Sequence, residues 1–316
     1  MKRPDDGILL VDKEEGETSH GVVKKVRSAL GQGKRYKVGH AGTLDPFATG
    51  LLVILLGQGT KLSRFIMAGE KEYLATLELG VETDTLDPTG RVTAVREVPR
   101  LTLNHIRETA KRYEGRIRQT PPAYSAVKHG GLRAYTLARK GISVKLKERT
   151  VTVHSVSIVS VDLPRITMRV RCGGGTYIRT LAADLAKSLG SVGRLKTLRR
   201  VKSGTFDVAD AISSVDIVSG SLVSVLENGM SLRDALPGLG EIAVDSRLAE
   251  KVRQGHQPCW EELPLPEGPI HPLPGNTEND QESFMKLVSG DKLLAILKKC
   301  DGGGGHEKVK FERVFS

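Results

Sequence analysis

One aspartate lies where a protein scaffold can present a reactive carboxylate. Asp45 belongs to residues 39–65, GHAGTLDPFATGLLVILLGQGTKLSRF, and separates a polar loop from an unbroken apolar run. An ionised carboxylate in such a position can act as a nucleophile. Asp45 also directly precedes Pro46, and this pair is typical of a helix start, with aspartate as the N-cap and proline at the first helical position. The residues alone leave both interpretations open.

The hydrophobic pattern predicts the elements that must position Asp45. Residues 7–13, GILLVDK, predict a short buried strand, and residues 51–57, LLVILLG, predict a central strand bounded by glycines. Amphipathic or capped stretches predict helices at 17–31, 60–69 and 101–117. Thr18 or Ser19 is expected to cap the first of these helices.

Alternation of apolar and polar residues predicts further strands at 73–79, 151–162 and 165–172. Three glycines at 173–175 allow a sharp entry into a following helix. The sequence has no regular strand–helix–strand repetition, so we expect an α+β fold. Its central sheet should be mixed, mainly antiparallel and flanked by helices.

The net charge of +11 is unevenly spread along the 316 residues. Residues 1–236 carry 38 Lys and Arg against 24 Asp and Glu, whereas residues 237–316 carry 10 against 13. A basic first part is typical of a protein that binds a phosphate backbone, although an ordinary basic cytosolic protein has the same composition. The loop at 31–40 contains Lys34, Arg35, Lys37 and His40, which either face solvent or contact phosphates.

Several classes of site and location do not fit the sequence. Its three cysteines are Cys172, Cys259 and Cys300, without a Cys-x-x-Cys pair, so neither a disulfide framework nor a zinc ribbon is indicated. The N-terminus lacks the apolar core of a signal peptide, and the longest apolar run is too short to span a bilayer. We therefore expect a soluble, cytoplasmic protein that does not associate with membranes.

Two short motifs are excluded as ligand sites by their spacing. Residues 57–63, GQGTKLS, lack the Gly-x-x-x-x-Gly-Lys-Ser/Thr pattern of a nucleotide-triphosphate loop. Asp84 and Asp87 lie in an acidic turn, but they do not have the alternating ligand positions of a calcium-binding EF-hand loop. No metal or cofactor is expected.

The stretch around Asp45 resembles the catalytic motif of the bacterial TruB-type tRNA pseudouridine synthases. Other matches follow in the order of that family: DKEEGETS at 12–19, QTPPAYSAVK at 119–128, GTYIRTL at 175–181 and LRRVKSGTF at 198–206. The resemblance covers roughly residues 7–206. It departs from the family at Glu14, where a proline is usual, and loss of that fixed turn predicts a looser loop beside Asp45.

The resemblance implies roles for individual residues. It makes Asp45 the catalytic nucleophile and Tyr73 the ring that stacks on the extruded uracil. The residues that it implies for substrate binding are Lys13, His40, Tyr73, Tyr177, Arg179 and Leu198. Tyr124, Ser125 and Lys128 are expected in one wall of the site, and Arg199 and Arg200 are expected to bind backbone phosphate or core carboxylates.

The activity that the resemblance implies is conversion of uridine 55 in the T-loop of tRNA to pseudouridine, by a protein that acts without guide RNA or cofactor. Two alternatives remain: a guide-RNA-dependent synthase subunit and a non-catalytic tRNA-binding or tRNA-folding protein. A monomer is expected, since no coiled-coil pattern is present. The absence of long Lys-rich extensions argues against the guide-dependent alternative.

The domain boundary is expected near residues 237–241, PGLGE, where composition changes. Residues 1–236 would form the catalytic domain and end in a helical connection over 209–236. Residues 242–316 resemble the small, β-rich PUA module that is appended to many members of this family.

Overall fold

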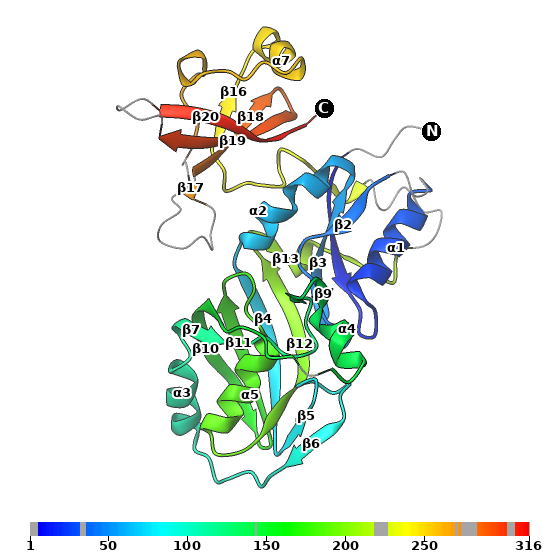
Figure 1. The fold of residues 1–316 in the computed structure, drawn as a ribbon, viewed down its shortest axis with the longest axis vertical. Helices are drawn as coiled ribbons and strands as arrows, with labels where there is room; N and C mark the ends of the chain where they lie inside the picture. Colours follow the sequence, from blue (N-terminus) through cyan, green and yellow to red (C-terminus); the bar gives the residue numbers. More distant parts are fainter. Residues whose placement is uncertain are drawn as a thin grey trace.

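The structure is a computed structural model that describes residues 6–31, 36–142, 144–217, 227–268, 271–272, 283–301 and 307–315. These residues form a large mixed sheet with helices packed against it and a second, smaller sheet at the C-terminal end (Figure 1). The arrangement confirms the expected α+β fold. The basic residues Lys34 and Arg35 lie outside the described ranges.

The large sheet is mainly antiparallel. Its main path runs in the order β14 (Ile212–Ser213), β1 (Gly7–Lys13), β3 (Thr49–Leu56), β12 (Gly193–Ser203), β4 (Lys71–Leu79), β11 (Arg165–Cys172), β10 (Arg149–Asp162) and β7 (Gly115–Gln119). Three short strands extend it: β2 (Val38–His40) beside β3, β13 (Phe206–Asp207) beside β12, and β15 (Gly229–Ser231) beside β1. Among the described pairings of this sheet, only β1 with β14 and β3 with β12 are parallel.

Helices α1 (Ser19–Ala29), α3 (Leu103–Lys111) and α5 (Ile178–Ser188) contribute to one continuous apolar cluster with the sheet. The side chain of Thr18 accepts a hydrogen bond from the backbone of Gly21 and so caps α1, as expected. Helix α3 is shorter than predicted because Gly115 has a φ of 93° and begins strand β7. The predicted helix at 60–69 is a 3-10 segment, Gly57–Leu62, followed by the short α2 (Ser63–Ala68).

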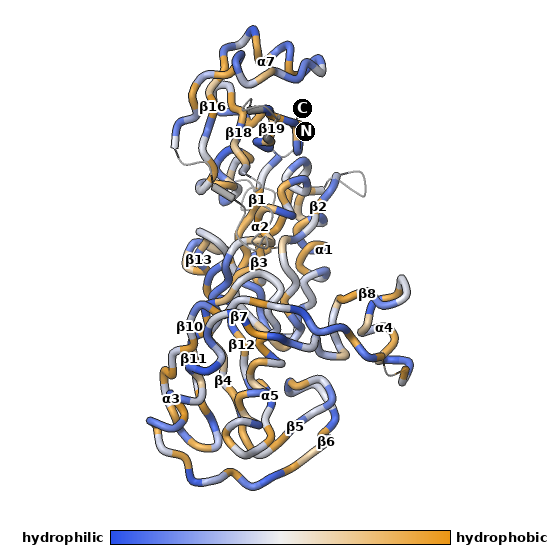
Figure 2. Tube along the Cα trace, turned by 60° about the vertical axis from the view of Figure 1, so that its left-hand side comes forward, coloured by the Kyte–Doolittle hydropathy of each residue, from blue (hydrophilic) through white to orange (hydrophobic). Residues whose placement is uncertain are grey.

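Two small hairpins leave the large sheet. The first pairs β5 (Val81–Thr83) with β6 (Val92–Val95), and the second pairs β8 (Lys128–His129) with β9 (Leu132–Arg133). Helix α4 (Ala134–Arg139) follows the second hairpin, and Figure 2 shows that β8 and α4 project from the body of the molecule.

The expected helical connection over 209–236 is wrong for most of its described residues. Val208–Asp210 form a single 3-10 turn, and strands β14 and β15 pair with β1, because the edge of β1 offers free backbone donors and acceptors. Residues 218–226 lie outside the described part of the chain.

The smaller sheet contains β16 (Glu241–Ala243), β17 (His271–Pro272), β18 (Ser283–Ser289), β19 (Lys292–Asp301) and β20 (Glu307–Val314), and α7 (Ser246–Arg253) lies against it. A second apolar cluster joins this unit to α2 and β3, with the rings of Phe65 and Phe284 edge to face at 5.4 Å between centroids. Lys61 Nζ donates to the carbonyl of Val314 at 2.6 Å, and Arg64 pairs with Glu312 at 2.5 Å. The two sheets are therefore joined by packing as well as by the chain.

None of the helices in the described part of the chain has the length and apolar character needed to span a bilayer.

Candidate active site

Asp45 opens a tight turn between β2 and β3. The backbone N–H of Ala48 donates to the carbonyl of Asp45 at 3.1 Å, which closes a four-residue turn with Pro46 in its second position. The interpretation of Asp45 as a helix N-cap is therefore wrong. The following residues enter β3 at Thr49 because pairing with β12 and β1 supplies their backbone bonds.

The carboxylate of Asp45 faces the guanidinium of Arg179, which comes 134 residues later in the first turn of α5. Nε of Arg179 lies 2.9 Å from Oδ2 of Asp45, and Nη2 donates to Oδ1 at 3.2 Å. This two-pronged geometry fixes both the position and the orientation of the carboxylate. The side chain of Asp45 remains 32% exposed while that of Arg179 is 5% exposed, so the carboxylate is accessible and its partner is buried.

Arg179 is held on its far side by three further groups. It donates to the carbonyls of Thr85 and Tyr124, each at 2.8 Å, and Nη1 lies 3.6 Å from Oδ2 of Asp87. All its donors thus have defined directions, and the residue cannot rotate without breaking several contacts. The expectation that Tyr124 lies in a wall of the site rests here on its main-chain carbonyl.

Asp87 is a site residue that the sequence reading missed, because its acidic turn was considered only as a calcium loop. Oδ1 accepts from the hydroxyl of Thr85 at 2.7 Å and from the backbone of Thr89 at 2.9 Å, which leaves Oδ2 to face Arg179. Leu86 lies between Thr85 and Asp87 and has a φ of 61°. This backbone conformation is energetically unfavourable for a residue with a branched side chain. Among the described residues, no group of His, Cys, Asp and Glu is arranged to hold a metal ion.

The backbone of the Asp45 turn is held from the opposite side by β1, α1 and the loop between them. The carbonyl of Pro46 accepts from the N–H of Gly16 at 2.8 Å and from Nζ of Lys13 at 3.3 Å. The hydroxyl of Ser19 donates to the carbonyl of Leu44 at 3.0 Å and accepts from its N–H at 2.9 Å. The residue before Asp45 and the residue after it are therefore both fixed.

Lys13 is fully buried and makes two other bonds, to the carbonyls of Glu14 and Glu17 at 2.8 and 2.9 Å. Burial lowers the pKa of Lys13 to about 8, against the opposing charges of Glu17 and Asp45. Because its ammonium is engaged by carbonyls, the geometry gives Lys13 a supporting place beneath the turn. Its predicted contact with substrate stays a prediction.

Arg200 also supports the turn. Its buried side chain donates to the carbonyls of Leu51 at 2.7 Å and Gly42 at 3.0 Å, on either side of Asp45 in the chain. Gly50 has a φ of 99°, and a Cβ there would lie 2.3 Å from the carbonyl oxygen of Arg200, so only glycine allows β3 and β12 to meet so closely. The expectation of phosphate or carboxylate binding is wrong for Arg200, whereas Arg199 does bind a carboxylate, that of Asp12, at 2.6 and 3.0 Å.

Tyr73 and Leu198 project from one face of the sheet, as a shared pocket requires. In the antiparallel register of β4 and β12, Tyr73 pairs with Arg200 and Ala75 pairs with Leu198. Both predicted pocket residues are almost fully buried and belong to the same apolar cluster as Leu44. Burial raises the pKa of Tyr73, so its phenol keeps its proton at neutral pH.

Tyr177 immediately precedes α5 and is anchored through its backbone. Its N–H donates to the side chain of Gln119 at 3.1 Å, and its ring lies under the guanidinium of Arg149, 4.3 Å from the ring centroid. Arg149 also donates to the carbonyl of Gly175 at 2.5 Å. Arg149 is the first residue of β10, and nothing in the sequence pattern marked it as a site residue.

His40 ends strand β2, one strand away from β1. Its Nδ1 is buried and has no hydrogen-bond partner among the described residues. Burial, together with the charge of Arg200, lowers the pKa of His40, so its imidazole is neutral at neutral pH. A neutral imidazole can donate or accept a hydrogen bond without adding charge to a substrate.

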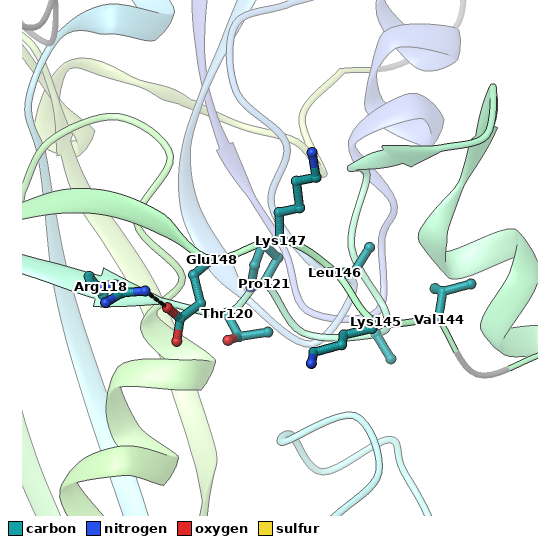
Figure 3. A pocket seen from close by; sticks show the side chains of 9 residues that line it. Arg118, Thr120, Pro121, Val144, Lys145, Leu146, Lys147 and Glu148 are labelled. Atoms are coloured by element: carbon teal, nitrogen blue, oxygen red, sulfur yellow. Dashed lines mark hydrogen bonds and ion pairs between the residues drawn. The ribbon is translucent and has the colours of Figure 1, made fainter.

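The segment that contains Tyr124, whose carbonyl accepts a hydrogen bond from Arg179, also forms one side of an open groove of about 680 Å³. It is lined by Arg118, Thr120, Pro121, Ala123, Val144, Lys145, Leu146, Lys147 and Glu148. Arg118 and Glu148 pair with each other at one end of it, and the side chains of Lys145 and Lys147 point in different directions (Figure 3). Ser125 is buried without a hydrogen-bond partner for its hydroxyl in the described structure.

Two opposing effects determine the charge of Asp45. Burial of the carboxylate raises the pKa of Asp45 above the ordinary value, and the guanidinium of Arg179 opposes that rise. The charge of Asp87 raises the pKa further, whereas Lys13 lowers it. The site thus combines an accessible carboxylate with a positive partner that favours its ionised form, the arrangement a carboxylate nucleophile needs.

Comparison with known proteins agrees with this geometry. Residues 27–178 match the family model described as TruB family pseudouridylate synthase (N terminal domain). A tRNA pseudouridine synthase B of Syntrophus aciditrophicus is 44% identical over 294 residues, which cover 93% of this chain and 91% of the relative. Another, of Desulfotalea psychrophila, is 50% identical over 219 residues, which cover 67% of this chain and 88% of the relative.

Among solved structures, the crystal structure of a Cbf5-Nop10-Gar1 complex contains a chain of the same fold. The two share 22% sequence identity and a TM-score of 0.75, over 99% of this chain and 86% of that one. The match to the family model and the identity to its full-length members lead to one conclusion: this chain belongs to the TruB family of pseudouridylate synthases.

Proposed function

We propose that this protein converts uridine to pseudouridine at position 55 in the T-loop of tRNA, acting alone without guide RNA, and that Asp45 is its nucleophile. The pairing of the Asp45 carboxylate with Arg179 carries the catalytic part of this proposal. The tRNA substrate is supported by the relatives, which are named tRNA pseudouridine synthase B.

The reaction breaks the bond between the ribose C1′ and N1 of uracil, turns the base and forms a new bond between C1′ and C5. The hydrogen of C5 leaves as a proton, and N1 gains one. The composition and oxidation state of the nucleoside do not change, so the chemistry requires no redox partner or energy source.

The ionised carboxylate of Asp45 serves this chemistry in either of two ways. It attacks the uracil ring, or it assists elimination at the sugar, and both routes need its negative charge. Arg179 supplies the charge that keeps Asp45 ionised in a partly buried place, and its two bonds orient the attacking oxygen.

The target base must leave its stack before it reaches Asp45, which costs a few kcal/mol. Stacking of a base on an aromatic ring contributes about 1–3 kcal/mol, so the ring of Tyr73 offsets much of this cost. Leu198 lies on the same sheet face and provides an apolar wall. Because Tyr73 keeps its proton, stacking and hydrogen bonding suit it better than the role of general base.

The chain is proposed to act as a monomer with two parts. Residues 1–236 form the catalytic domain, and residues 242–316 form a PUA-like RNA-binding module. The basic charge of the first part supports binding to the phosphate backbone of the T-arm. His40, Tyr177 and Lys13 would contact or support the RNA around the extruded base.

The test uses T-arm RNA that carries tritium at C5 of its uridines. Wild-type protein alone is expected to release the label to water, because bond formation at C5 expels that hydrogen. Asp45→Asn keeps the shape of the side chain and removes its charge, so we expect it to bind the RNA with unchanged affinity and to release label on the order of 10³-fold more slowly or worse.

Three results would contradict the proposal. Substantial turnover by Asp45→Asn would remove Asp45 as the nucleophile. Release only after addition of a guide RNA would indicate the guide-dependent synthase. Tight, salt-sensitive tRNA binding without release by the wild type would indicate a protein that only binds or folds RNA.

A further inference from the structure

A hydrogen bond joins Glu14, in the loop after β1, to Ser214, which comes 200 residues later in the chain. The N–H of Glu14 donates to the hydroxyl oxygen of Ser214 at 3.1 Å. Ser214 is fully buried, and strand β14, just before it, runs parallel to β1 with Asp12 opposite Ser213. The N–H of Ser214 donates in turn to the carbonyl of Asp12 at 2.9 Å.

This bond depends on the residue type at position 14 in an unusual way. The side chain of Glu14 is exposed, so its contribution here is its backbone N–H. A proline, usual at this place in the motif that DKEEGETS resembles, has no N–H to donate. The sequence departure thus creates a donor, and the expectation of a looser loop overlooked it.

The same loop reaches Asp45 on its other side. Two residues close to Glu14 donate to the carbonyl of Pro46: Lys13 through Nζ at 3.3 Å and Gly16 through its N–H at 2.8 Å. Lys13 Nζ also bonds the carbonyl of Glu14 at 2.8 Å. A continuous set of hydrogen bonds therefore leads from Ser214 through residues 13–16 to the turn that presents the carboxylate.

We propose that the Glu14–Ser214 hydrogen bond positions Asp45, with Glu14 and Ser214 as positioning residues. Ser214 holds the loop against β1, and the loop holds Pro46, so the carboxylate keeps its place against Arg179. This inference rests on the proposed function of Asp45. Small displacements of a reacting group lower rates strongly, so one such bond has a measurable effect on turnover.

The test compares Glu14→Pro, which removes the donor, with Ser214→Ala, which removes the acceptor, and with Glu14→Ala, which keeps the N–H. Lys13 ends a strand, so its extended backbone tolerates a following proline. Glu14→Pro and Ser214→Ala are each expected to lower kcat about 3- to 10-fold, with KM within about twofold of wild type. The conservative Glu14→Ala should retain the wild-type kcat.

The double variant Glu14→Pro/Ser214→Ala separates this role from unrelated damage. Its kcat should equal that of the slower single variant, because one bond is lost only once. Additive losses, an equal loss in Glu14→Ala, a wild-type kcat in Ser214→Ala, or a change confined to KM would each overturn the inference.

Hydrogen exchange provides a readout that does not depend on activity. The amide of Gly16, which bonds to Pro46, should exchange faster in Ser214→Ala and Glu14→Pro than in the wild type and Glu14→Ala. Unchanged exchange at Gly16 would overturn the positioning role. A wild-type protein without turnover would instead contradict the proposed function, and the exchange result would still decide this inference.

Discussion

Asp45 is held from two sides that are built from different interactions. On one side, Gly16 and Ser19 fix its turn through bonds to the main chain of its neighbours. On the other side, the charged groups of Arg179 and Asp87 contact the carboxylate or its partner. We call these the backbone side and the carboxylate side.

The two sides therefore have different effects on Asp45. Neutral hydrogen bonds to carbonyls and amides determine where the turn lies but have little influence on a proton equilibrium. Nearby charges determine whether the carboxylate is ionised. Loss of a neutral bond on the backbone side should therefore alter turnover equally at every pH, whereas changes to the charged groups of the carboxylate side should also move the pH profile.

The largest effect is expected from Arg179→Gln. Loss of the guanidinium removes both the orientation and the charge partner of the carboxylate, which should lower kcat roughly 10²- to 10³-fold. Without the guanidinium, the pKa of Asp45 rises further, so a smaller fraction is ionised at a given pH. The acidic limb of kcat, measured by label release between about pH 5 and about pH 8, should move to higher pH.

Arg179→Lys sharpens that result, since it keeps the charge and loses the two-pronged geometry. Its acidic limb should lie between those of wild type and Arg179→Gln. An acidic limb that stays at the wild-type pH in Arg179→Gln would show that the two sides do not differ in the way described.

Asp87→Asn should have a smaller effect and move the profile in the opposite direction. Its amide oxygen can still accept the bonds from Thr85 and Thr89, but the charge that faces Arg179 is lost. We expect kcat to fall about tenfold. Because the charge of Asp87 raises the pKa of Asp45, its removal should move the acidic limb to lower pH.

Asp84→Asn is the matched control for Asp87→Asn. Asp84 lies in the same loop, but it pairs with Arg91, whose side chain is 92% exposed. Its kcat and pH profile should equal those of the wild type. A shift of equal size in both variants would reflect a general change of surface charge rather than the contact with Arg179.

The smallest effect is expected on the backbone side, from Ser19→Ala. This variant leaves the N–H and carbonyl of Leu44 without their partner, which should lower the free energy of unfolding by about 1–3 kcal/mol. We expect kcat to fall a few-fold, with the acidic limb unchanged. Chemical denaturation and the same label-release assay measure the two quantities.

Thr18→Ala controls for the loss of helix stability alone. Thr18 caps α1, and its loss should cost about 1 kcal/mol of unfolding free energy. Thr18 makes no bond to Leu44 in the described structure, so kcat should stay at the wild-type value. A pH shift in Ser19→Ala, or equal losses of kcat in both variants, would contradict the proposed difference between the backbone side and the carboxylate side.

The sequence was most informative where a pattern is local or shared with a family. The period of two in β4 places Tyr73, Ala75, Leu77 and Leu79 on one buried face, as alternation predicts. The motif resemblance placed Asp45 and Arg179 in one site although 134 residues separate them, and the structure pairs the two side chains. Neither inference required knowledge of strand register.

The features that the sequence could not supply are mostly consequences of register and packing. Lys13 reads as a surface lysine until the loop after β1 folds over Pro46 and buries it. Arg200 reaches Gly42 only because β12 lies beside β3. The helix start proposed for Asp45 failed because strand pairing outweighs a local capping preference.

Strand β3 has a consequence for the molecules that this protein can accept. The Asp45 turn lies at its start, and the 3-10 segment with Lys61, which touches the C-terminal unit, follows its end. Its eight residues span about 26 Å of stiff, buried backbone. A ligand that touches both ends of β3 must therefore span a fixed length.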